Sequence, residues 1–137
     1  MDSFSFEKLQ VYQQAKEYVK DVYSLTYKFP QNERYCLCDQ LKRAAVSIVS
    51  NIAEGSGRNS YKDKVHFVEI AYGSLMESLC QLQIAADLGF INQDEYADLN
   101  KKVHIIAKLL SGLRKSFKDA IQSQITKYPI TCGHKPQ

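Results

Sequence analysis

The sequence predicts an all-α fold, an antiparallel up-down-up-down four-helix bundle, from three observations. Apolar residues recur at intervals of three and four along four long stretches, which is the period of an amphipathic helix. No stretch alternates with period two for long enough to predict a strand. The connections, at about residues 29–36, 55–60 and 89–92, are short, so consecutive helices are expected to run antiparallel.

The first helix is expected over residues 6–28, and it ends before Pro30 because the residue before a proline is pushed out of helical geometry. Its apolar residues occupy four of the seven heptad phases, whereas a helix of a lone bundle usually needs about three. The surplus predicts a homo-oligomer in which this helix supplies part of the subunit interface. The residues expected there are Val11, Tyr18 and Leu25.

The second helix is expected over residues 37–54, with Gly55 in the left-handed conformation that closes a helix. A polar stripe runs beside its apolar face, formed by Gln40, Arg43, Ser47, Asn51 and Glu54.

Arg43 is expected to pair with Glu77 of the third helix, or else with Glu69, in a partly buried ion pair that fixes the register of the bundle. The alternatives are a ligand or subunit contact for this pair, or an active carboxylate at Glu77. Structural roles are thus assigned to Arg43, Glu77, Asn51, Glu54 and Gly55.

The third helix is expected to begin after an N-cap at Ser60 and to end at Leu88, before Gly89. The fourth begins at Asn92, an N-cap with Glu95 three residues later, and fades near residues 121–125. Both helices carry a three-four apolar repeat. The core is therefore expected to bury Val65, Tyr72, Leu75, Leu79, Leu99, Val103, Ile106, Leu110 and Leu113.

The chain has 137 residues, which is the size of one domain, and its 45% hydrophobic content predicts a folded chain. Residues 1–126 are expected to form the bundle and residues 127–137 a flexible C-terminal tail. No apolar run approaches the roughly 18 residues of a membrane span, and the N-terminus lacks the pattern of a signal peptide. We therefore expect a cytoplasmic protein without a membrane partner, with its four cysteines reduced.

Catalytic and metal-binding patterns are missing from the sequence. No two histidines have the spacing of metal ligands, and HExxH and CxxC motifs do not occur. Cys36 and Cys38 could hold a metal only with ligands from elsewhere. The sequence thus predicts a protein that is not an enzyme, with no catalytic residue, no cofactor and no evident small-molecule substrate.

Basic residues follow acidic ones along the fourth helix, an order that suits the helix dipole and also an anionic partner. Lys101, Lys108 and Lys115 lie seven residues apart and form one row, which Lys118 extends, whereas Lys102 and Arg114 flank it at wider angles. The Gly55–Arg58 loop lacks the lysine of a phosphate-binding P-loop, and helix termination explains it, with a phosphate contact as the alternative. The candidate nucleic-acid-binding residues are Lys101, Lys102, Lys108, Arg114, Lys115 and Lys118, with Arg58 and Lys62 as helpers.

Several segments together are similar to one known family. They are Phe6-Glu7-Lys8-Leu9, Phe29-Pro30, the run from Gln40 to Ile48, the run from Asn51 to Arg58, and Ala71-Tyr72-Gly73-Ser74-Leu75-Met76-Glu77. The sequence resembles the bacterial four-helix-bundle proteins that are encoded in intervening sequences of the 23S rRNA gene and are sometimes labelled ribosomal-protein-like. This family often has proline where the chain has Val49, which leaves open whether the second helix is kinked.

The resemblance implies a ring-shaped homopentamer and kinship with the accessory protein of diversity-generating retroelements, which assists a reverse transcriptase and binds nucleic acid through a basic surface. The leading hypothesis is therefore a non-enzymatic ring that binds structured RNA, or an RNA and reverse-transcriptase complex. The alternative is a protein-interaction scaffold of a multi-protein complex without direct nucleic-acid binding. A steep salt dependence of binding would distinguish the first hypothesis from the second.

Overall fold

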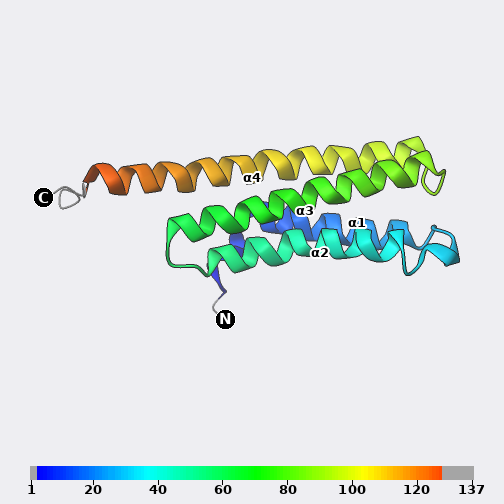
Figure 1. Cartoon of the computed structure of the whole chain (residues 1–137), viewed down its shortest axis with the longest axis horizontal. Helices are drawn as coiled ribbons and strands as arrows, with labels where there is room; N and C mark the ends of the chain where they lie inside the picture. Colours follow the sequence, from blue (N-terminus) through cyan, green and yellow to red (C-terminus); the bar gives the residue numbers. More distant parts are fainter. Residues whose placement is uncertain (1–2, 128–137) are drawn as a thin grey trace, which may run out of the picture.

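The computed structural model describes residues 3–127, in which no strand occurs. Four helices run alternately up and down along one long axis (Figure 1), which confirms the predicted all-α four-helix bundle. Two short 3₁₀ turns, Ser5–Lys8 and Gln31–Glu33, precede the first and second helices. The helices are α1 (Gln10–Thr26), α2 (Leu37–Ser56), α3 (Tyr61–Asp87) and α4 (Gln93–Lys127).

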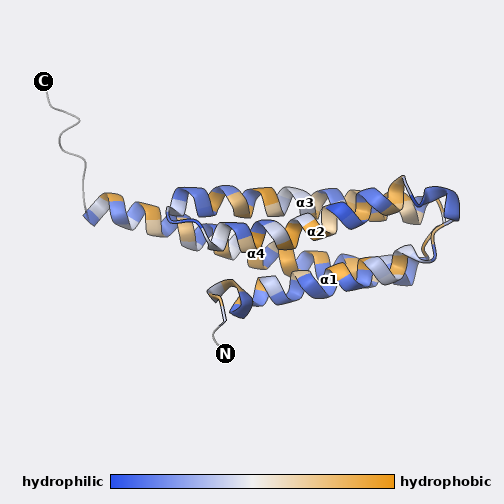
Figure 2. Ribbon diagram, turned by 90° about the horizontal axis from the view of Figure 1, so that it is seen from below, coloured by the Kyte–Doolittle hydropathy of each residue, from blue (hydrophilic) through white to orange (hydrophobic). Residues whose placement is uncertain are grey.

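The core is built from the apolar faces of all four helices, and Figure 2 shows hydrophobic and hydrophilic segments alternating along each of them. The prediction that Tyr72 belongs to the core is wrong, because its side chain is 37% exposed. It lies at the rim of the groove between α3 and α4. Leu79 and Leu113 are only partly buried. The other expected core residues are buried, namely Val65, Leu75, Leu99, Val103, Ile106 and Leu110.

The starts of α3 and α4 follow the sequence prediction closely. The Ser60 hydroxyl accepts a hydrogen bond from the Asp63 N–H at 3.1 Å. At α4 the Asn92 side chain accepts from the Glu95 N–H at 2.8 Å, and the Glu95 carboxylate accepts from the Asn92 N–H at 2.9 Å. Gly89 takes a φ of 78° in the turn between the two helices, which favours glycine.

The start of α1 differs from the prediction, because the helix begins at Gln10 instead of residue 6. Leu9 is extended and separates α1 from the preceding 3₁₀ turn. That turn is closed by the Glu7 carboxylate, which accepts the Phe4 N–H at 2.9 Å. The local hydrogen bond thus competes with continuation of the helix.

Gly55 does not close α2, as was expected, but lies buried inside its last turn, and Gly57 follows as the C-cap. A Cβ atom at Gly55 would lie 2.9 Å from the Cβ atom of Phe67 in α3. Glycine is therefore required here for close approach of two helices and not for a left-handed turn. α2 runs as one helix through Val49.

α4 is longer than its neighbours and projects beyond the α2–α3 turn (Figure 1). The Tyr61 and Phe117 rings, 5.9 Å apart, join the first turn of α3 to α4 at this end. Lys127, which the sequence assigned to the tail, is the last residue of α4. The rest of the expected tail, residues 128–137, lies outside the described residues.

Candidate nucleic-acid interface

The predicted row of lysines on α4 faces solvent. Lys101, Lys108, Lys115 and Lys118 are all exposed. Lys101, Lys108 and Lys118 have no carboxylate partner within residues 3–127. The Lys115 ammonium group lies 3.0 Å from the Asp119 carboxylate, but both side chains are mostly exposed. Such a pair contributes little to stability and leaves the ammonium group accessible. We call these four residues the α4 lysine row.

Lys102 and Arg114 point sideways from α4 toward its two neighbours. Lys102 forms an ion pair with Asp21 of α1. The Arg114 Nε atom lies 2.7 Å from the Glu69 carboxylate of α3. Each of these cations neutralises a carboxylate of the same chain, so the six basic residues of the prediction divide into an outward row and two inter-helix contacts.

The two expected helpers, Arg58 and Lys62, also differ from each other. Arg58 lies 2.6 Å from the Glu54 carboxylate and stacks over the Phe67 ring, with its guanidinium carbon 4.7 Å from the ring centre. These contacts with Glu54 of α2 and Phe67 of α3 stabilise the turn between the two helices. Lys62 is exposed in the first turn of α3 and has no carboxylate partner in the described chain. It lies at the same end of the bundle as Lys118, because their sequence neighbours form the aromatic contact described above.

Lys64 is a structural residue that the sequence analysis missed. Its ammonium group donates to the carbonyl oxygen of Ser56 at 3.1 Å and to that of Gly55 at 3.5 Å, at the end of α2. Cations near a helix C-terminus stabilise its unpaired carbonyl groups. Because this lysine comes from the following helix, no local pattern in the sequence of α2 indicates it.

The expected pairs of Arg43 with Glu77 or Glu69 are wrong. Arg43 is exposed and pairs with Asp39, one turn earlier in α2, at 2.9 Å. Glu69 is already engaged by Arg114. Glu77 is exposed and accepts a long hydrogen bond, 3.4 Å, from Gln81 on its own helix. Position 43 therefore lies on the solvent side of the α2–α3 contact, where a neighbouring carboxylate on the same helix is nearer than one across the seam.

Smaller polar groups occupy the α2–α3 contact instead. The hydroxyl groups of Ser47 and Ser74 are hydrogen-bonded at 2.8 Å. The Asn51 amide donates to the Ser47 carbonyl oxygen at 2.8 Å and to its hydroxyl at 3.0 Å. Asn51, through these bonds, and Glu54, through its ion pair with Arg58, thus both have partners within the chain.

The prediction of a subunit interface on α1 is wrong for its three named residues, because they are already buried in the single chain. The exposed fractions are 4% for Val11, 0% for Tyr18 and 8% for Leu25. The wide apolar band of α1 is used within the protomer, where this helix packs against both α2 and α4. The Tyr18 hydroxyl is hydrogen-bonded to Ser78 at 2.8 Å, and burial raises the pKa of Tyr18 to about 12.

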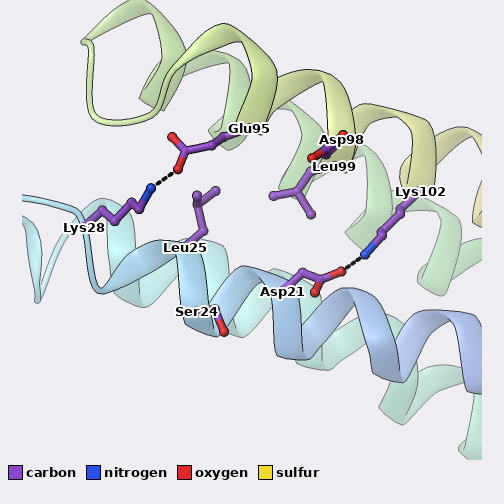
Figure 3. A pocket seen from close by; sticks show the side chains of 8 residues that line it. All are labelled: Asp21, Ser24, Leu25, Lys28, Glu95, Asp98, Leu99 and Lys102. Atoms are coloured by element: carbon purple, nitrogen blue, oxygen red, sulfur yellow. Dashed lines mark hydrogen bonds and ion pairs between the residues drawn. The ribbon is translucent and has the colours of Figure 1, made fainter.

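A cavity of about 280 Å³ opens between α1 and α4 (Figure 3). The ion pair of Lys28 with Glu95 closes one end, and Lys102 with Asp21 lies at the other. The Lys28 hydrogen bond and the Asn92 N–H hold the pKa of Glu95 below its usual value. Because the lysines here already have partners, this cavity is a seam between helices and not a strong anion site.

Across residues 3–127 we find no group of three or more His, Cys, Asp or Glu side chains that could hold a metal ion. None of the helices in that range is long and apolar enough to cross a membrane. The fold and this surface define a helical-bundle protein with a solvent-facing cationic row.

The chain belongs to the 23S rRNA-intervening sequence protein family, whose pattern it matches over residues 7–112. A solved structure from Bacteroides thetaiotaomicron, described as a protein with unknown function from the S23 ribosomal protein family, shares the fold with a TM-score of 0.70. It is 23% identical, and the alignment covers 77% of this chain and 95% of that one. No curated protein matches the sequence.

Proposed function

We propose that this protein is a non-enzymatic homo-oligomer that binds structured RNA, alone or together with a reverse transcriptase, through the α4 lysine row. The observation that carries the proposal is the exposure of Lys101, Lys108 and Lys118 without a carboxylate partner in the described chain. Such ammonium groups gain more from a phosphate than paired ones do, because no internal contact has to be broken.

The row favours contact with the sugar-phosphate backbone over the reading of bases. From Lys101 to Lys118 it extends on the order of 25 Å along the helix, enough to follow several phosphates. The exposed large apolar side chains of α4 are Ile105 and Ile125, so the row includes no aromatic ring on which a base could stack. Binding is therefore expected to depend on RNA shape and charge more than on sequence.

An oligomer would multiply this modest surface. The net charge of one chain is only +3, and several copies of the row in one assembly bind a long RNA more tightly than one copy does. Two exposed large apolar side chains of α3, Ile70 and Ile84, lie fourteen residues apart and so on one face of the helix, whereas the exposed Tyr72 borders the groove with α4. We therefore place the subunit contact on the outer face of α3, while a ring of five follows only the family resemblance.

Charge reversal tests the RNA contact. The variant with Lys101, Lys108 and Lys118 all changed to Glu should lose binding of an RNA hairpin in a fluorescence anisotropy titration. The comparison variant changes Lys8, Lys16 and Lys20 to Glu, which alters the net charge equally in α1 and the turn before it and should retain most of the affinity. Lys20 loses an exposed ion pair with Glu17 in this variant, a contact that contributes little to stability. Equal losses in both variants would show that only net charge matters. Absence of hairpin binding by the wild-type protein would favour the scaffold alternative.

Sedimentation velocity tests the oligomer separately. The wild-type protein should sediment as an assembly at micromolar concentration, and the variant with Ile70 and Ile84 changed to Glu should sediment as a monomer. Ile105→Glu, at a similarly exposed isoleucine of α4, serves as the control and should leave the assembly intact. A wild-type monomer would contradict the proposed assembly.

A further inference from the structure

A small cavity of about 260 Å³ lies at the connection between α1 and α2. Phe29 and Cys38, both buried, contribute to its inner wall, whereas Tyr27, Arg34 and Lys42 lie at its rim. Tyr27 is 86% exposed, which is unusual for an aromatic side chain beside a cavity. No residue that lines the cavity carries a carboxylate.

The two cations of this cavity are available to an anion. Arg34 and Lys42 have no ion pair in the described chain, and the Lys42 ammonium lies 5.0 Å from the centre of the Tyr23 ring. Asp39, which lies nearby in α2, is engaged by Arg43 at 2.9 Å. Glu33, half-buried in the 3₁₀ turn, is the remaining carboxylate of this connection and does not line the cavity.

The buried thiol at the cavity wall adds no negative charge at neutral pH. Cys38 Sγ donates to the Thr26 carbonyl oxygen at 3.7 Å, and burial raises the pKa of this thiol. The cavity therefore joins an exposed aromatic face to two unneutralised cations and a neutral interior. This combination suits a ligand with a flat aromatic part and an anionic part.

We infer that this cavity binds an unpaired nucleotide, with its base stacked on Tyr27 and its phosphate held by Arg34 and Lys42. The site rests on the proposed RNA binding and extends it, because the α4 lysine row offers no stacking surface. The α1–α2 and α3–α4 connections lie at the same end of the bundle (Figure 1), and Lys101 is the residue of the row that is nearest in sequence to the α3–α4 connection. A folded RNA that follows the row could present an unpaired nucleotide at this end.

The chain supplies a matched control for the stacking residue. Tyr35, in the same connection, is 85% exposed but does not line the cavity. The test measures the affinity of the full chain for an eight-nucleotide single-stranded RNA and for a blunt RNA duplex, by fluorescence anisotropy at fixed salt. Tyr27→Ala should weaken binding of the single strand at least about fivefold, while Tyr27→Phe and Tyr35→Ala should leave it within about twofold of wild type.

A second variant removes the two cations of the cavity. Arg34→Ala together with Lys42→Ala should weaken binding of the single strand, with little change for the duplex. Circular dichroism checks that each variant keeps the wild-type helical content. An equal loss for Tyr27→Ala and Tyr35→Ala, or no loss for either, would overturn the site. If the wild type binds duplex but not single-stranded RNA, this inference fails while the proposed function stands. If it binds only the single strand, and the binding depends on Tyr27, the α4 interface fails while the cavity site stands.

Discussion

The seam between α2 and α3 and the seam between α1 and α4 are built differently. α2 and α3 approach so closely that Gly55 has no room for a side chain against Phe67, and a hydroxyl pair, Ser47 with Ser74, bridges them. α1 and α4 instead leave a cavity between them that is open to solvent. Two ion pairs cross it, Lys28 with Glu95 and Lys102 with Asp21 (Figure 3).

The difference indicates which contacts hold α4 in the bundle. Long side chains that meet at a partly exposed seam lose conformational freedom and are screened by solvent, so their ion pairs contribute little. The buried apolar row of α4, which includes Val103, Ile106 and Leu110, must supply most of the attachment. The α2–α3 seam, by contrast, depends on small residues whose enlargement would push the helices apart.

The largest effect is expected in the buried row of α4. Ile106 is fully buried, so Ile106→Ala should lower the free energy of unfolding by about 2–5 kcal/mol, through lost burial and the cavity that remains. Chemical denaturation measures this loss. Ile105→Ala, at the adjacent exposed isoleucine, is the control and should change the stability much less. Equal effects at the two positions would mean that the apolar row does not hold α4.

Enlarging Gly55 tests the close seam. The Cβ atom of Gly55→Ala would lie 2.9 Å from the Cβ atom of Phe67, so the helices must shift, at a cost of about 1–3 kcal/mol. Gly73→Ala in α3 is the opposite case, because nothing lies within 4 Å of its added Cβ atom, and it should stabilise the protein by up to about 1 kcal/mol. Thermal unfolding of both variants measures these effects: the melting temperature should fall for Gly55→Ala and rise for Gly73→Ala. Stabilisation by Gly55→Ala would contradict the tight packing of α2 on α3.

Tyr18 links α1 to α3 and makes the stability depend on alkaline pH. Its folded pKa of about 12 lies above the usual value near 10, so its contribution is fully present below pH 10 and is lost as the pH rises toward about 12. Tyr18→Phe should cost about 1 kcal/mol at neutral pH, through loss of the Ser78 hydrogen bond. The difference from wild type should shrink between pH 10 and 12 in urea titrations. A constant difference across this range would show that the hydroxyl titrates normally.

The smallest effect is expected at the open seam. Asp21→Ala removes the partner of Lys102, but both side chains are more than a third exposed, so the loss should stay below about 1 kcal/mol. The urea midpoint at low and at high salt measures this loss, and the small effect should shrink as salt screens the pair. A loss as large as that of Ile106→Ala would make the ion pairs, and not the apolar row, the attachment of α4.

The sequence predicts those features that neighbouring residues decide. Ser60 and Asn92 cap α3 and α4 as expected, because each cap needs only a polar side chain and an N–H three residues away. The periodicity of the apolar residues also suffices for the number of helices, and the short connections suffice for their antiparallel order. The division of the basic residues of α4 into an outward row and two flanking residues follows from the helical repeat as well.

Contacts between distant segments are less predictable. Arg43 could be assigned to Glu77 only by counting residues along two helices, whereas Asp39 lies one turn earlier on the same helix and is within reach without any contact between helices. The apolar surplus of α1 was real, but the sequence could not show that α2 and α4 cover it within one chain. The stacking surface at Tyr27 was missed because its cations, Arg34 and Lys42, join it only through the folded connection.

The salt dependence of RNA binding tests the central claim most directly. For the wild-type protein and an RNA hairpin, the logarithm of the association constant should fall linearly with the logarithm of salt concentration. Changing Lys101, Lys108 and Lys118 to Ala should flatten that slope by roughly 2–3 for each bound protomer, because each lost phosphate contact removes about 0.7–0.9. The same slope in wild type and variant, or a wild-type affinity that does not respond to salt, would contradict an RNA interface on α4.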